Sequence, residues 1–171
     1  MSGRARAQGT PAVPGGSPHP VPVGAELVVF RAGEERFAMS VAAIESVIEM
    51  PPLTPLPVMP PAMLGVVELR GALLPIYSPA HVLRTVLEAP GAALIARRAG
   101  GRGDATRSIG IAIDGAEDVV LYDPDAWGGV GGPLPQGGLV RGVGTCDGHL
   151  TTLLDASLFI AACCATAGEE E

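Results

Sequence analysis

The sequence predicts an all-β fold with a few short helices, arranged as a barrel or a sandwich. Three observations lead to this prediction. Roughly nine or ten short segments rich in Val, Leu and Ile follow one another at the close spacing typical of such folds. Asp-Gly pairs, which favour two-residue hairpin turns, occur at positions 114–115 and 147–148. Segments long enough to form a helix are rare, and no obvious repeat of 20–50 residues occurs.

The chain is expected to divide into an ordered domain and two tails. Residues 1–24 are predicted to be a disordered tail, because five prolines between positions 11 and 22 disfavour helices and inner strands. The ordered domain is expected at residues 25–165, a common length for one domain. Residues 166–171 include three consecutive glutamates and are predicted to be an acidic tail.

The first predicted elements follow directly after the tail. Leu27–Phe30 and Phe37–Met39 flank the turn-forming residues Gly33–Glu35 and predict a hairpin. The apolar residues of Val41–Met50 are spaced in a way that suits a short helical turn running into a strand. The proline-rich segment 51–57 suits neither a helix nor a central strand, so we expect an extended connection across the surface.

The middle of the chain is predicted to combine a hairpin with helical turns. Met63–Leu64, which follow two prolines, are expected to form a helical turn. Val66–Leu69 and Ala72–Tyr77 predict two strands, joined by a turn at Arg70-Gly71. Ala80–Leu87 predicts a short helix.

Strands dominate the second half of the chain. Ala92–Arg98 and Ser108–Ile113 predict two strands, and Gly110 is expected on a crowded face of the second. Asp114-Gly115 predicts a hairpin turn before a strand at Val119–Tyr122. Loops are expected at residues 100–107 and 127–138.

A second hairpin and a helix complete the predicted domain. Leu139–Cys146 and His149–Leu154 predict two strands on either side of Asp147-Gly148. Asp155 is then expected to cap a helix that extends from Ala156 to about Ala165.

The charge and the cysteines exclude several classes of protein. A formal net charge of −7 argues against binding to nucleic acid and to anionic membrane surfaces, which both require basic faces. We find neither a signal peptide nor an apolar run that could insert in a membrane, and we expect a cytoplasmic protein. Cys146, Cys163 and Cys164 form no recognisable disulfide framework or C-x-x-C motif, so reduced thiols are expected.

No constellation of residues predicts catalysis, a metal site or a cofactor site. His19, His81 and His149 lack the spacing of metal ligands, and no G-x-S-x-G motif occurs. Every basic residue except the histidines is arginine, so a Schiff-base or P-loop lysine is impossible. The well-placed aspartates are all explained by turns or by a helix cap. The sequence therefore favours a binding protein over an enzyme.

The Arg70-Gly71 turn is the strongest candidate for a binding feature. An arginine at the tip of a hairpin projects a rigid guanidinium group, which can engage carboxylates or backbone carbonyls of a partner. The alternative is a solvated arginine that forms a local ion pair with Glu68. The residues alone do not decide between these two interpretations.

The segment around this turn resembles the CheW-like domain family of bacterial chemotaxis adaptors. Gly65 to Pro79 is similar to the family pattern G-V-x-N-L-R-G-x-x-x-P-V-x-D-L. The resemblance continues in chain order over about 135 residues of the sequence. It includes the opening hairpin, Val41–Glu49, the proline-bearing connection, Ile109–Val120 and the closing segment from Val140 to Asp155.

The resemblance implies two intertwined five-stranded SH3-like barrels with a C-terminal helix. It also implies an adaptor that connects the cytoplasmic tips of methyl-accepting chemoreceptors to the regulatory domain of a CheA-type histidine kinase, within membrane-associated receptor arrays. The residues that would bind partners, by match to the family, are Ile44, Glu45, Val47, Glu68, Arg70 and Gly71. The kinase contacts are expected at the barrel ends, where no residues can be assigned.

Two departures from the family pattern leave alternatives open. Glu68 replaces the family's asparagine and Ser78 replaces an aspartate, and an ion pair with Glu68 would make Arg70 less available. The chain could therefore be a divergent paralogue that regulates a pathway other than chemotaxis. A β-barrel that binds a small ligand or nucleic acid is the alternative from a different class.

Overall fold

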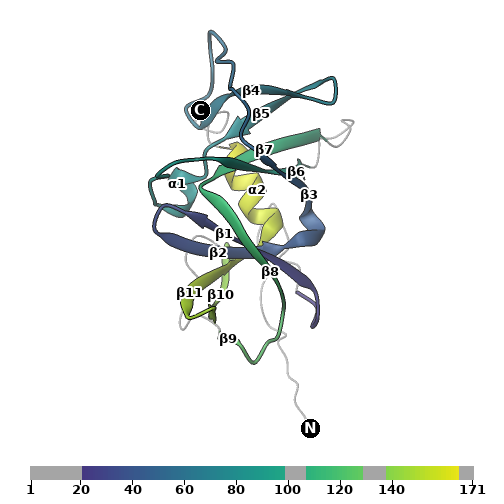
Figure 1. Ribbon diagram of the computed structural model, residues 1–171, viewed down its shortest axis with the longest axis vertical. Helices are drawn as coiled ribbons and strands as arrows, with labels where there is room; N and C mark the ends of the chain where they lie inside the picture. The colour runs from purple at the N-terminus through teal and green to yellow at the C-terminus, as the bar shows by residue number, and fades with distance from the viewer. Residues whose placement is uncertain (1–20, 99–106, 129–137, 166–171) are drawn as a thin grey trace.

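The computed structural model describes residues 21–98, 107–128 and 138–165. Within these residues the chain forms short strands, one 3₁₀ turn and two helices (Figure 1). The strands are β1 (Glu26–Ala32), β2 (Glu35–Ser40), β3 (Ile44–Glu49), β4 (Met63–Leu69), β5 (Ala72–Tyr77), β6 (Ala92–Arg98), β7 (Arg107–Ile113), β8 (Gly115–Leu121), β9 (Trp127–Gly128), β10 (Val140–Cys146) and β11 (His149–Leu154). The helical elements are η1 (Val41–Ala43), α1 (Ala80–Leu83) and α2 (Ala156–Ala165).

The strands form two sheets, and the strands of the second sheet all lie between β2 and β8 of the first sheet along the chain. The six-stranded sheet has the order β8-β1-β2-β11-β10-β9, and the five-stranded sheet has the order β3-β6-β7-β5-β4. Each sheet is mostly antiparallel but contains one parallel pair, β2 with β11 in the first and β5 with β7 in the second. The chain therefore leaves the first sheet after β2 and returns to it at β8. The predicted mainly β class is confirmed.

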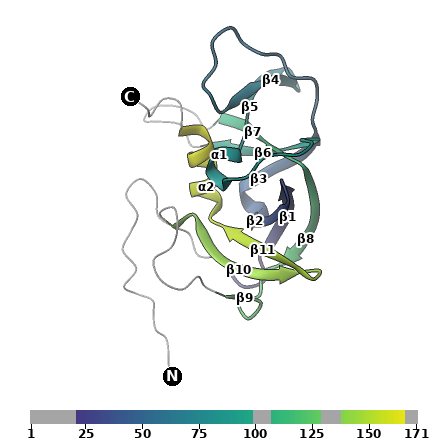
Figure 2. The same ribbon diagram turned by 90° about the vertical axis from the view of Figure 1, so that its left-hand side faces the viewer.

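A core shared by both sheets joins the two halves of the molecule. Phe30 and Phe37 from the six-stranded sheet, Ile111 from the five-stranded sheet and Phe159 from α2 belong to one buried cluster. The ring of Phe30 lies 5.8 Å from that of Phe37 and 6.2 Å from that of Phe159, measured between centroids. Figures 1 and 2 show α2 at the junction of the two sheets. Two further clusters fill the separate sheets, one around Ile76 and Ile95 and one around Trp127.

Strand β1 contributes to two of these clusters because it is buried on both faces. Side chains of a strand point alternately to opposite faces. Val28 and Phe30 therefore face the shared core. Leu27 and Val29 face the opposite side of the strand and pack in the separate cluster around Trp127. This arrangement explains why the apolar run in the sequence is continuous rather than alternating.

Two hairpin turns and the final helix follow the predictions. Arg70 and Gly71 have φ angles of 54° and 81°, and Asp147 and Gly148 have φ angles of 49° and 79°. Positive φ at both central residues defines the type I′ turn that suits a twisted hairpin. The Asp155 Oδ1 atom accepts a hydrogen bond of 3.0 Å from the Leu158 N–H and so caps α2.

The hairpin predicted at Asp114-Gly115 is wrong. Strand β7, which ends at Ile113, belongs to the five-stranded sheet, whereas β8 pairs with β1 in the other sheet. The Asp114-Gly115 pair is therefore the passage between the two sheets. A local turn signal cannot show that the next strand pairs with a segment more than 80 residues earlier in the chain.

Two helix predictions also need correction. Met63 and Leu64 begin β4 and do not form a helical turn, because Met63 pairs with Tyr77 across the hairpin. The helix predicted at Ala80–Leu87 ends at Leu83, because Arg84 adopts a left-handed conformation with φ of 58°. The predicted loop at 127–138 begins with the short strand β9.

Several predictions lie wholly or mostly outside the described residues. These are the disordered tail at 1–24 beyond its last few residues, the loop at 100–107 before Arg107, the remainder of the glycine-rich loop, and the acidic tail at 166–171.

Candidate partner-binding site

The hairpin between β4 and β5 presents Arg70 to solvent. The left-handed conformation of Arg70 is unusual for a residue with a Cβ atom, and the neighbouring Gly71 adopts its φ without steric cost. Arg70, Gly71 and Glu68 are all exposed. Within the residues that the structure describes, no ion pair joins Glu68 to Arg70. The local pairing considered from the sequence is therefore absent.

Strand β3 supplies the other predicted residues, and it lies at an edge of the five-stranded sheet. Its side chains alternate, so that Ile44 is half-buried against the shared core, whereas Glu45 and Val47 are exposed. The exposed fraction of Val47 is 42%. A half-buried Ile44 contributes to the core and leaves only part of its surface for a partner.

Glu45 is the best-connected of the predicted residues. Its carboxylate accepts a hydrogen bond of 2.5 Å from Arg97 Nε and bonds of 3.0 and 3.1 Å from the Ser108 hydroxyl. The bond from Arg97 is the main reason that the pKa of Glu45 lies below its usual value, and Ser108 and the charge of Arg70 act in the same direction. Partial burial opposes this shift. Glu45 is thus held in a fixed, charged state on the surface.

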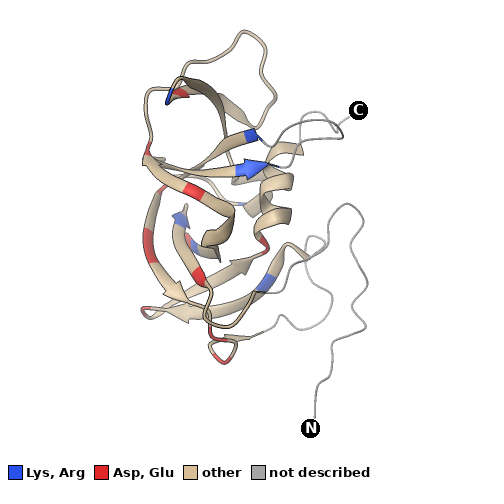
Figure 3. Cartoon of the chain, turned by 90° about the vertical axis from the view of Figure 1, so that its right-hand side faces the viewer, with Lys and Arg blue, Asp and Glu red and all other residues tan. Residues whose placement is uncertain are grey.

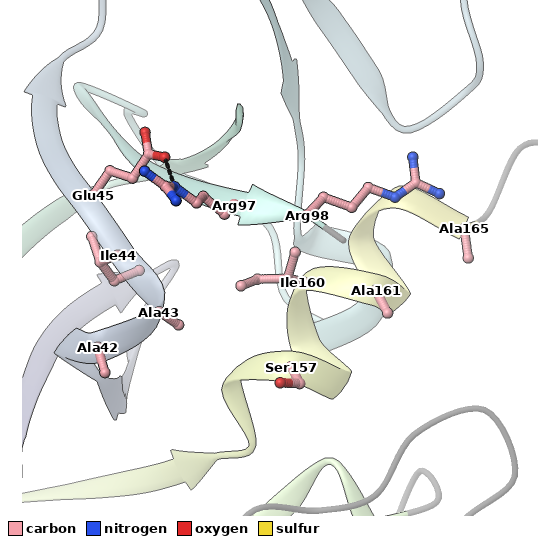
Figure 4. Close-up of a pocket in the computed structure, with 10 residues that line it drawn as sticks. All are labelled: Ala42, Ala43, Ile44, Glu45, Arg97, Arg98, Ser157, Ile160, Ala161 and Ala165. Carbon is pink, nitrogen blue, oxygen red and sulfur yellow. Dashed lines mark hydrogen bonds and ion pairs between the residues drawn. The ribbon is translucent and has the colours of Figure 1, made fainter. Parts of the chain in front are cut away.

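Two adjoining grooves meet at Glu45. The smaller groove, of about 470 Å³, is lined by both Glu45 and Arg70, together with the apolar Leu73 and Ile109. The larger groove, of about 850 Å³, is lined by Ile44 and Glu45 on one side and by α2 on the other (Figure 4). The structure therefore brings Ile44, Glu45 and Arg70 together around one hollow surface. Val47, Glu68 and Gly71 line neither groove.

The sequence did not indicate other residues that shape this surface. Arg97 and Arg98 lie at the end of β6 and line the larger groove, and Arg107 lines the smaller one. Val119 and Leu121 of β8 are exposed as well, with exposed fractions of 52% and 65%, but they line neither groove and lie on an edge strand of the other sheet. The sequence shows two adjacent arginines at the end of a predicted strand. It does not show that they line a groove, because the groove forms only where α2 packs beside that strand.

No cluster of three or more His, Cys, Asp or Glu side chains among the described residues could hold a metal ion. No described helix is long and apolar enough to cross a membrane.

Two interleaved sheets around one core, with grooves lined by apolar and charged side chains, define a double-barrel binding domain. The chain matches the model of the CheW-like domain family over residues 26–163. It belongs to that family.

Individual relatives agree with this assignment. The chemotaxis protein CheW of Rhizobium meliloti (strain 1021) is 43% identical over 53 residues, which cover 31% of this chain and 34% of the relative. A probable chemotaxis protein CheW of Rhizobium etli is 41% identical over 51 residues, which cover 30% of this chain and 33% of the relative. Both alignments thus span about a third of each relative.

A solved structure supports the fold over a greater length. The crystal structure of the scaffolding protein TtCheW from Thermoanaerobacter tengcongensis superposes with a TM-score of 0.64 at 18% sequence identity. The match covers 82% of this chain and 90% of that chain. The predicted arrangement of two SH3-like barrels is confirmed.

Proposed function

We propose that this chain is an adaptor that couples chemoreceptors to a CheA-type histidine kinase, in chemotaxis or a related signalling pathway. The observation that carries the proposal is the CheW-like family fold with Arg70 presented beside a groove that contains Glu45. The printed names of the relatives, a chemotaxis protein and a scaffolding protein, point in the same direction. No feature of the described surface favours a barrel that binds nucleic acid or a small ligand.

In this proposal Arg70 is the main contact with the cytoplasmic tip of a receptor. Its guanidinium group offers several donors in a rigid plane, and among the ion pairs of the described residues none joins it to Glu68. Ile44 and Val47 supply apolar surface on β3, and Glu45 supplies a carboxylate whose position is fixed by Arg97. Glu68 and Gly71 flank Arg70 at the hairpin tip.

The second partner is the regulatory domain of the kinase. An adaptor that binds a receptor and a kinase at the same time needs two separate binding surfaces. In a double barrel, the ends of the barrels and the grooves beside them can serve as these two surfaces. We place the kinase at the barrel ends and the receptor at the surface around Arg70. The adaptor would then be recruited to membrane-associated receptor arrays through its protein partners.

The substitution Arg70→Ala tests the role of the hairpin. We expect it to weaken receptor binding by at least about tenfold, since a charge-assisted hydrogen bond contributes roughly 1.5–3 kcal/mol. The free energy of unfolding should change by less than about 0.5 kcal/mol, because the side chain is exposed. Binding is measured by calorimetry with a receptor signalling fragment and a kinase regulatory domain from the same genome.

The chain provides a matched control for this experiment. Arg84 is also an exposed arginine in the left-handed conformation, with φ of 58°, but it lies after α1 and away from both grooves. Arg84→Ala should bind both partners like the unmodified protein. Unchanged receptor binding by Arg70→Ala would remove Arg70 from the site. A chain that binds neither receptor nor kinase would overturn the adaptor proposal itself.

A further inference from the structure

The connection between β3 and β4 is a proline-rich segment that the candidate site does not use. Six of the twelve residues from 50 to 61 are proline, and none of the twelve is charged. Figures 1 and 2 show this connection rising beyond β4 and β5, at the end of the molecule opposite the six-stranded sheet. It carries no basic or acidic position in Figure 3. The segment is therefore a neutral, projecting surface in a chain of net charge −7.

The prolines restrict the backbone of this segment to extended conformations. Each proline ring fixes φ at about −65°, and a residue that precedes a proline is disfavoured in the helical region. Between positions 50 and 61, only Leu53 and Val58 are neither proline nor followed by proline. In the structure residues 50–56 form no helix or turn, and the chain bends at Pro57 and Val58. The first half of the segment is thus held extended by its own sequence.

The base of the segment is fixed against the five-stranded sheet. The Thr54 N–H donates a hydrogen bond of 2.9 Å to the Val66 carbonyl, and the Thr54 carbonyl accepts one of 3.0 Å from the Val66 N–H. The side chains of Met50 and Leu53 pack against the apolar cluster of this sheet. Because the segment is already restricted and anchored, little conformational entropy remains to be lost when another molecule binds it.

The central part of the segment exposes apolar side chains that play no part in the core. Residues 54–58 are all exposed, and the exposed fraction is 41% for Leu56 and 88% for Val58. Pro52 is exposed as well. In an extended chain with three residues per turn, Pro52 and Pro55 lie on the same edge. These two prolines have the P-x-x-P spacing that proline-recognition domains bind.

We propose that residues 51–58 are a docking segment for a protein domain with an aromatic-lined groove of the kind that recognises polyproline. The rings of Pro52 and Pro55 lie against aromatic side chains of the groove, and Leu56 and Val58 add apolar contact beside them. Such a domain gains affinity because the segment is extended before it binds. This partner is additional to the two partners of the proposed function, and the inference depends on neither of them.

A second copy of this chain does not suit the segment, because its aromatic side chains are not available. All six aromatic residues of the chain lie in the part that the structure describes. Tyr122 is half-buried and packs against the apolar cluster of the six-stranded sheet. The other five are at most 8% exposed, namely Phe30, Phe37, Tyr77, Trp127 and Phe159. The aromatic groove therefore belongs to a different protein.

Titration of the full chain with a panel of SH3, WW and EVH1 domains tests the proposal. The chain is isotope-labelled for NMR, because the amide signals of Leu53, Leu56 and Val58 report on the segment. We expect at least one domain to shift these signals, and an excess of decaproline peptide to reverse the shift by occupying the groove. The absence of a shift with every domain at millimolar concentration would overturn the proposal.

The double substitution Pro52→Ala and Pro55→Ala removes the two proline rings and should weaken binding by at least about tenfold, because both rings are anchors of the interface. Pro124→Ala is the matched control, since Pro124 is also exposed but lies between β8 and β9 of the other sheet, and it should bind like the unmodified protein. If circular dichroism shows that the double variant is unfolded, Val58→Asp takes its place, because a charge at this exposed position opposes burial in an apolar groove. Undiminished binding by the folded variant overturns the proposal.

Binding measurements with the two proposed partners separate this inference from the adaptor role. The double variant should bind a receptor fragment and a kinase regulatory domain like the unmodified protein. If it binds the kinase domain more weakly and no domain of the panel binds, the segment belongs to the kinase contact, so the inference fails and the adaptor role stands. If the unmodified chain binds neither receptor nor kinase but binds a panel domain through residues 51–58, the adaptor role fails and the inference stands.

Discussion

The carboxylate of Asp114 connects three segments of the chain. It accepts hydrogen bonds from the backbone N–H groups of Gly33 at 2.6 Å, Glu88 at 3.1 Å and Ala89 at 2.7 Å. Partial burial raises the pKa of Asp114, but these three bonds and the nearby Arg31 more than compensate and hold the pKa below its usual value. A residue expected to form a hairpin turn therefore fixes the passage between the two sheets.

Replacing Asp114 should destabilise the protein in a pH-dependent way. Asp114→Asn should lower the free energy of unfolding by about 2 kcal/mol near neutral pH, since it weakens three charge-assisted hydrogen bonds, of which the one from the Gly33 N–H is partly buried. The folded-state pKa is lowered, so this contribution is present above the unfolded pKa of about 4 and is lost as the pH falls through the folded pKa. The difference between the two proteins should therefore shrink below about pH 4.

Urea unfolding at several pH values measures this effect. Asp125→Asn is the control, because Asp125 is an exposed turn residue, and it should behave like the unmodified protein. A stability difference for Asp114→Asn that stays constant down to pH 2, well below the usual pKa of an aspartate, would contradict the assigned role of its charge.

At the scale of elements, sequence patterns predict strands well and strand partners poorly. The Asp147-Gly148 hairpin forms as expected, because β10 and β11 are neighbours in both sequence and space. The same dipeptide at 114–115 does not form a hairpin, because β8 pairs instead with β1. Met63 joins a strand despite the preceding prolines because Tyr77 pairs with it. Local signals contain no information about such distant partners.

The candidate site shows the same limit. The sequence pattern around Arg70-Gly71 indicated the hairpin tip, and the apolar spacing of Val41–Met50 indicated strand β3. The grooves themselves depend on the packing of α2 beside β3 and β6, which no local pattern describes. For this reason Arg97 and Arg98 were predicted only as the end of a strand.

Gly110 is a point where element packing can be tested. The sequence predicted a crowded face there, and a Cβ atom at Gly110 would overlap Cδ1 of Ile76 and lie 3.4 Å from Cδ1 of Ile95. Gly110→Ala should cost about 1–3 kcal/mol of stability through overpacking. Adding Ile76→Val removes the overlapping methyl group. The double variant should therefore be less destabilised than the sum of the two single changes.

Thermal or urea unfolding of the unmodified protein, the two single variants and the double variant gives the four stabilities of this double-mutant cycle. Gly91→Ala serves as the control, because a Cβ there would meet only the Ala89 carbonyl oxygen, at an ordinary distance of 3.7 Å. It should change stability by less than about 0.5 kcal/mol. Strictly additive effects of Gly110→Ala and Ile76→Val would show that the two positions do not compete for space.

At the scale of the whole molecule, the shared core determines how the two sheets behave together. Phe159 of α2 is fully buried and belongs to the cluster that includes residues of both sheets. The separate cores of the sheets are smaller. Neither sheet can unfold alone without exposing its side of this cluster. We therefore expect the described domain to unfold as one cooperative unit.

The single tryptophan allows this expectation to be tested directly. Trp127 is buried in the cluster that belongs to the six-stranded sheet, so its fluorescence reports on the unfolding of that sheet. Circular dichroism reports on the secondary structure of both sheets. The two signals should give one coincident urea transition. Phe159→Ala should lower the free energy of unfolding by about 3–5 kcal/mol through loss of packing, and it should shift both signals equally. If fluorescence and circular dichroism separated, either in the unmodified protein or in the variant, the sheets would be independent units. The shared cluster would then be an interface between two domains rather than a common core.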